Sequence, residues 1–267
     1  MRGFFPQPEL TINNRNHTVK SSLIIPGGLA VLTLTALTSC KVFDAKPAAD
    51  SGFNPTTAPT ATRAAFLQQV WVAEAYRGKA VKDHFSSVYI APVNTRYMGK
   101  QTWSQQQSAH NTELTHDTDA FAQRMQGQFQ NAIASYPGKK LRLASGPGKR
   151  VLVIELALVE LVPSKAFWNT AATAAGFIVP GAGFLSLAGA GSIAIEGRLR
   201  DGGTHEILAT FKDRRNDKAA PINLNSYTWY GGAEGNVKDW AAEFAELLNT
   251  PPNHVVKRAS AVTLKPW

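Results

Sequence analysis

The apolar residues along this chain follow two periods, one helical and one of two residues. Helical spacing predicts three helices, over residues 62–77, 117–136 and 237–248, and Asn236 is placed to cap the last one. The middle helix has the clearest apolar face, formed by Phe121, Met125, Phe129 and Ile133. The turn Pro137-Gly138 would end it.

Alternating or continuous apolar runs predict the strands. They cover residues 86–93, 141–143, 151–162, 192–201 and 206–212. The run 151–162 is nearly all apolar, which is typical of a strand buried on much of both faces. The last two strands alternate on either side of a glycine turn, so they predict a hairpin. These elements predict an α+β fold with two layers, a mainly antiparallel sheet of about four to six strands with helices on one face.

A charge-free apolar stretch, Leu23–Leu37, comes shortly before the single cysteine, Cys40, and basic residues precede it. This order is typical of a secretory signal, and the stretch is too short to cross a bilayer as a helix. The run Leu37-Thr38-Ser39-Cys40 resembles the lipobox of bacterial lipoproteins. That resemblance implies a signal peptide over 1–39 and an acylated Cys40 that attaches the chain to a membrane. The alternative is an ordinary small cysteine behind a misassigned start.

The segments that flank the predicted domain differ from it in composition. Residues 40–62 are rich in Pro, Ala, Thr and Ser, and we expect a flexible tether in which Gly52-Phe53 docks onto the fold. Residues 63–250 form the single predicted domain, and residues 251–267 a basic, mobile tail. The net charge of +9 fits a solubilising surface or contact with anionic lipid head groups, and an exported protein is not expected to bind nucleic acid.

A second charge-free stretch lies between Lys165 and Glu196. Its candidate contact residues are Phe177, Ile178, Phe184 and Leu185. Three hypotheses stay open: an excursion packed on its own domain, the same excursion touching the membrane or a protein partner, and a glycine-mediated helix interface. Pro180 and the many small residues argue against a membrane span.

Motifs with known chemistry are weak throughout the chain. His110 and His116 share a polar stretch, 99–116, that predicts a solvated loop rather than a zinc site. The run Gly146–Lys149 lacks the spacing of a phosphate loop and predicts a turn. Asp213-Arg214-Arg215 favours a salt-bridge cluster over a head-group site, and the aromatic group at 227–230 favours packing over sugar binding. We therefore predict no catalytic residue, no metal and no cofactor.

The strand patterns resemble one known family, the domain-of-unknown-function family 3313 of bacterial lipoproteins. The segments that carry the resemblance are Val88–Val93, Pro180–Gly183, Ser192–Asp201, Glu206–Arg215 and the closing helix with Trp240. The resemblance implies an envelope lipoprotein and supplies no activity. Lys41, directly after the cysteine, favours the outer membrane on its periplasmic side.

The predicted function is a non-enzymatic envelope lipoprotein that presents an interaction domain as an assembly or accessory component. The alternative is a carrier or sensor of a small apolar ligand, in a pocket walled by residues 166–191.

Overall fold

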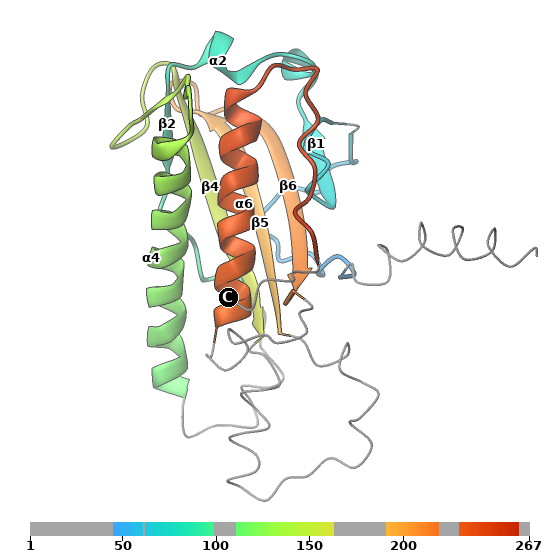
Figure 1. Cartoon of the computed structure of the whole chain (residues 1–267), viewed down its shortest axis with the longest axis vertical. Helices are drawn as coiled ribbons and strands as arrows, with labels where there is room; N and C mark the ends of the chain where they lie inside the picture. The colour runs from blue at the N-terminus through green and yellow to red at the C-terminus, as the bar shows by residue number, and fades with distance from the viewer. Residues whose placement is uncertain (1–44, 61, 99–110, 163–190, 219–229, 262–267) are drawn as a thin grey trace, which may run out of the picture. The chain divides into compact units, whose positions relative to one another are not determined.

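The computed structural model describes residues 45–60, 62–98, 111–162, 191–218 and 230–261 (Figure 1). The chain divides into two units, Met1–Ser39 and Cys40–Trp267, and all described residues lie in the second. In the described part, no helix is both long enough and apolar enough to cross a bilayer.

One mixed sheet of six strands forms the centre of the domain, in the order β1-β6-β5-β4-β2-β3. The strands are β1 (Gln69–Val72), β2 (Ser87–Ile90), β3 (Arg142–Leu143), β4 (Val151–Val162), β5 (Ser192–Asp201) and β6 (Ile207–Asn216). Strands β1, β6, β5 and β4 pair antiparallel, each with the next. Strand β2 runs parallel to both of its neighbours, β4 and β3. The predicted hairpin is β5–β6, and the α+β class is confirmed.

Two long helices, α4 (Asn111–Ser135) and α6 (Gly231–Asn249), lie side by side in Figure 1. Both are longer than predicted. Helix α4 includes residues 111–116 of the expected loop, and α6 begins before Asn236. Asn236 is not a cap, because it is buried within the helix and its Nδ2 donates to the carbonyl of Asn216, 3.0 Å away, at the end of β6.

The helix predicted over residues 62–77 is wrong. This segment contains β1 and a single 3-10 turn, η2 (Glu74–Tyr76), and a short helix, α2 (Val81–His84), follows. Strand β1 pairs with β6 from Gln69 opposite Lys212 to Val72 opposite Ala209. Hydrogen bonding to the open edge of β6 satisfies the backbone of β1, and this outweighs a weak helical period in the sequence.

The main core packs α4 and α6 with apolar residues of the sheet. Its largest fully buried side chains include Trp240, Phe66, Phe121, Phe129 and Phe244. The ring of Phe244 lies 4.9 Å from that of Phe211 in β6. Opposite Phe211, β5 has Gly197, where a Cβ atom would lie 2.1 Å from the Phe211 ring. Glycine at this strand position therefore makes room for an aromatic core residue.

The other face of the sheet is covered by residues 45–60, which we call the N-terminal strap. Phe53 is buried against Ala157, Val159 and Ala194, and its ring lies 4.2 Å below the guanidinium of Arg198. The predicted docking of Phe53 is confirmed, and it holds this part of the predicted tether against the sheet. Backbone N–H groups of the strap donate to the buried carboxylate of Glu196, which the composition of the segment does not reveal.

The start of the predicted mobile tail is also ordered against the domain. Val256 is fully buried and pairs with Ala64 in an isolated parallel bridge. The backbone N–H of Ala259 donates to Glu243, 2.7 Å away. An apolar and a polar anchor therefore connect this part of the predicted tail to the domain.

Candidate functional site

An apolar cavity of about 480 Å³ lies at the end of the sheet where β5 turns into β6. Its floor includes Leu152 and Leu208, which are 1% and 4% exposed. One wall is the segment 76–85, which contains α2, and another is the C-terminal end of α6 with Leu247. Val255 in the tail segment completes the lining and is 50% exposed, so it lies on the solvent side. Pockets of 300–1,000 Å³ are typical of small-molecule sites.

The charged residues that line this cavity are all basic. Arg63, Arg77 and Lys79 belong to the lining, and no aspartate or glutamate does among the described residues. None of the three forms an ion pair in the part of the chain that the structure describes. The cavity therefore combines apolar walls with positive charge that forms no ion pair among the described residues.

Arg63 is fixed by the end of α6. Its guanidinium donates to the hydroxyl of Thr250 at 2.9 Å, to the carbonyl of Pro251 at 3.0 Å and to the carbonyl of Leu247. A cation is favourable at the negative end of a helix dipole. Burial lowers the pKa of the Arg63 guanidinium, but an arginine stays protonated at neutral pH.

Arg77 and Lys79 are exposed and flank Gly78, whose φ of 69° is in the left-handed region. The Nε of Arg77 donates to the carbonyl of Val72 at 3.1 Å, which ties the loop to the end of β1. The glycine turn thus places two cations on one short loop at the solvent side of the cavity.

Two aromatic side chains complete this wall. The rings of Tyr76 and His84 meet edge to face, with centroids 5.5 Å apart. Burial, together with the nearby carboxylates of Glu206 and Asp201, raises the pKa of Tyr76. Its hydroxyl therefore stays protonated at neutral pH and remains a hydrogen-bond donor.

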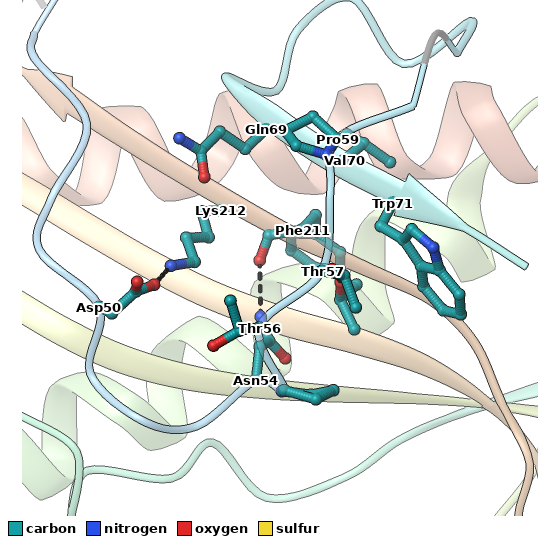
Figure 2. A pocket seen from close by; sticks show the side chains of 12 residues that line it. Asp50, Asn54, Thr56, Thr57, Pro59, Gln69, Val70, Trp71, Phe211 and Lys212 are labelled. Carbon is teal, nitrogen blue, oxygen red and sulfur yellow. Dashed lines mark hydrogen bonds and ion pairs between the residues drawn. The ribbon is translucent and has the colours of Figure 1, made fainter.

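A second pocket, of about 80 Å³, lies where the strap crosses β1 and β6 (Figure 2). Figure 2 shows Asp50 directed at Lys212, with which it forms an ion pair, and Asn54 directed at the carbonyl of Phe211, 3.1 Å from its Nδ2. Thr57 lies within hydrogen-bond distance of Thr210, 3.3 Å. These groups pair with one another, so the pocket is a polar seam that attaches the strap.

A third group of polar residues, the buried ion cluster, lies between β6 and α6 and consists of Asp213, Arg215, Trp240, Glu243 and Arg258. Arg215 donates to Asp213 at 2.9 Å and to Glu243 at 2.6 Å. Asp213 also accepts from the indole N–H of Trp240 at 2.7 Å and from Arg258. Each charged group has a partner of opposite sign, which indicates a structural role.

The motif Asp213-Arg214-Arg215 is therefore divided between the two faces of the sheet. Arg214 lies on the strap side and pairs with Glu160 at 2.7 Å, while its two neighbours belong to the buried ion cluster. The predicted salt-bridge cluster agrees with these contacts. Alternation along the strand explains why neighbouring arginines meet different carboxylates.

The predicted attachment and contact residues lie outside the described residues. They are Cys40, Phe177, Ile178, Phe184 and Leu185. The same holds for residues 166–190 of the predicted pocket wall 166–191, and for His110, Tyr227 and Trp229. Tyr230 is described, and it is buried with its ring 5.5 Å from that of Phe121. In the described ranges, no group of three His, Cys, Asp or Glu residues is arranged to hold a metal.

Sequence reasoning missed the cavity. Its basic loop, Arg77–Lys79, straddles the end of the helix predicted over residues 62–77, and that boundary separates Arg77 from Lys79. The signal that identifies them is the glycine between two basic residues, which is typical of a turn rather than a helix interior.

Comparison with known proteins gives one family match. A family model described as "Protein of unknown function (DUF3313)" matches residues 64–244. No curated protein matches the chain.

Two solved structures are similar at a distance, both dodecamers of PelC from Paraburkholderia phytofirmans. A single-substitution variant has 10% sequence identity and a TM-score of 0.36, and the match covers 68% of this chain and 97% of that one. A PelC dodecamer in another crystal form has 10% identity and a TM-score of 0.31, with 72% and 97% covered.

Proposed function

The chain belongs to the DUF3313 family of proteins of unknown function, and on that premise we propose that it is a lipid-anchored, non-enzymatic protein of the bacterial cell envelope. The observation that carries this proposal is Cys40 at the end of a lipobox-like run, directly after an apolar stretch. Acylation of that cysteine would attach the chain to a membrane, and about two acyl chains give a stable anchor.

The order of the strap supports a close attachment. Ala45 is already buried, and its carbonyl accepts from Nε2 of Gln68 at 2.5 Å. It lies five positions after Cys40, and an extended chain over five positions spans about 17 Å. An acylated Cys40 would therefore hold the domain next to the lipid surface rather than on a long leash.

The pairing of charged groups supports a non-enzymatic role. The buried carboxylates of Asp213 and Glu243 face arginines, and Glu196 accepts hydrogen bonds from the strap. Carboxylates that act as general acids or bases must face a substrate instead. We propose that the domain acts as an accessory or assembly component that binds other molecules of the envelope.

The anchor is tested by fractionating cells that express the full chain with Cys40→Ser. We expect the wild type to incorporate an alkyne-labelled palmitate and sediment with membranes, and the variant to lose the label and become soluble. Labelling that persists in Cys40→Ser, or a wild type without label, would contradict the proposal.

The position after the cysteine offers a matched variant that keeps the anchor. If Lys41 favours the outer membrane, Lys41→Asp should keep the palmitate label and move the protein to inner-membrane fractions. An unchanged distribution would contradict the outer-membrane assignment alone and leave the anchor standing.

A further inference from the structure

The cavity at the hairpin end of the sheet is polarised from floor to opening. Its floor is apolar and closed, with Leu152 and Leu208 almost fully buried. Its solvent side carries the exposed cations Arg77 and Lys79 beside the half-exposed Val255. A molecule that satisfies both ends has an apolar body and an anionic head.

We propose that this cavity binds an amphiphile with a single alkyl chain and one anionic head group, such as a fatty acid or an alkyl phosphate. The chain would lie along Leu152, Leu199 and Leu208, where burial of methylene groups drives binding. The head would lie beside Arg77 and Lys79, which have no carboxylate partner among the described residues.

Charge complementarity selects this occupant over a neutral one. Arg63 adds positive charge to the wall although its N–H groups are engaged by the end of α6. Glu206 and Asp201 have an electrostatic effect on Tyr76 in the wall but are not part of the lining. A neutral alcohol of the same length would leave the cations without a partner.

The volume also fits a small molecule rather than a protein segment. About 480 Å³ is within the range of ligand sites, and the floor is formed by strands of a rigid sheet. The proposal does not depend on the lipid anchor, because every residue that carries it belongs to the folded domain.

Photoaffinity labelling of the full chain in a total cell lysate, which contains it whether or not it is attached to a membrane, tests the proposal without purifying a fragment. The probe is a dodecanoate that carries a diazirine, and the matched control probe is the corresponding dodecanol. We expect the carboxylate probe to label peptides from residues 76–85 and 247–255, and the alcohol to label them at least about 10-fold less efficiently, as loss of two charge interactions predicts.

Competition by unlabelled compounds then defines the chemistry. We expect dodecanoate to compete about 10-fold better than decanoate, because burying two further methylenes strengthens binding by about that factor. Stronger competition by dodecyl phosphate than by dodecanoate would assign the head group to the phosphate class, and the reverse order to the carboxylate class.

Charge reversal provides the decisive variants. The double variant Arg77→Glu, Lys79→Glu should lose labelling by about 10-fold, whereas the equal change Lys149→Glu, Lys238→Glu, at exposed lysines outside the lining, should stay within about twofold. Val255→Asp should also lose labelling and Val255→Leu should keep it. Equal labelling by both probes, insensitivity to the double reversal, or labelling confined to other peptides would each overturn the proposal.

Failure here and failure of the anchor are separate outcomes. Loss of palmitate labelling in the wild type would leave cavity labelling untouched, and absent cavity labelling would leave membrane attachment by Cys40 untouched.

Discussion

The two faces of the sheet are packed by different kinds of side chains. Toward α6, the strands present aromatic and aliphatic side chains, and the charges there are collected in the buried ion cluster. On the opposite face, charged residues alternate along the strands and pair across them, as Glu155 does with Arg198 at 2.7 Å and with Arg200 at 3.1 Å. The strap then covers part of this charged surface.

This difference shows how charged residues on a strand face can be buried. Glu196 is 2% exposed although its side chain is charged, because the strap supplies N–H donors from Ser51 and Asn54. The helix side depends mainly on apolar burial, whereas the strap side depends on ion pairs and hydrogen bonds between charged and polar groups. Mutations on the two faces should therefore lower the free energy of unfolding by different amounts.

The largest expected contrast lies between two neighbouring arginines of β6. Arg215→Leu would leave Asp213 and Glu243 buried without their main partner, and we expect a loss of about 3–5 kcal/mol in the free energy of unfolding. Arg214→Leu, the matched control on the strap side, removes a partly exposed pair with Glu160 and should cost about 1 kcal/mol. Urea denaturation measures both, and equal costs would remove the distinction between the faces.

A pH-dependent effect is expected at Asp217, directly after β6. Burial raises the pKa of this carboxyl to about 6, although the N–H of Gly191 donates to it at 3.0 Å. The folded state therefore binds the proton more tightly than the unfolded state, and stability falls as the pH rises from about 4 to 6 and stays lower above that.

Asp217→Asn removes this penalty. We expect it to raise the free energy of unfolding by about 3 kcal/mol at pH 8 and to change it little at pH 4. Thermal denaturation at the two pH values tests this, and a gain of equal size at both would show that the carboxyl is not desolvated.

A smaller loss in the free energy of unfolding is expected for a substitution in β5 opposite Phe211. Gly197→Ala places a methyl group where the ring now lies, and the overpacking should cost about 1–3 kcal/mol. Gly146→Ala is the matched control, because a Cβ atom there meets nothing within 4 Å. It should change stability by less than about 0.5 kcal/mol, and a tolerant Gly197 would mean that the core can shift the ring freely.

The smallest global effect should come from the strap itself. Phe53→Ala removes its aromatic contact with Arg198 and should cost about 1 kcal/mol globally, because the strap can open without unfolding the sheet. Limited proteolysis should nevertheless cut residues 45–60 much faster than in the wild type. Thr56→Ala, at an exposed strap position, should leave the cleavage rate unchanged.

The sequence predicts those elements whose pattern is local. Strands β4 and β5 match their predicted bounds because alternation and apolar runs specify them residue by residue. Strand β1 could not be predicted in this way, since its partner Lys212 is far along the chain from Gln69. The strap follows the same rule, because its composition is that of a linker and its anchor is Glu196.

The cavity could not be predicted from the sequence for a related reason. Its walls come from β4, the hairpin, the segment 76–85 and the residues after α6, and no single stretch of sequence contains its pattern. Only the basic loop around Gly78 has a local signature. A site that combines four distant segments becomes visible when the topology brings them together.

We expect the buried ion cluster to be among the last parts of the interior to form. It joins the carbonyl of Phe66 to Arg215 across 149 positions, and Arg258 reaches Asp213 across another 45. Contacts of such long sequence separation form late, because loop closure costs entropy before the contacts reward it. A growing chain therefore has every strand and both long helices available before Arg258 is made, yet completes its interior only when that residue arrives.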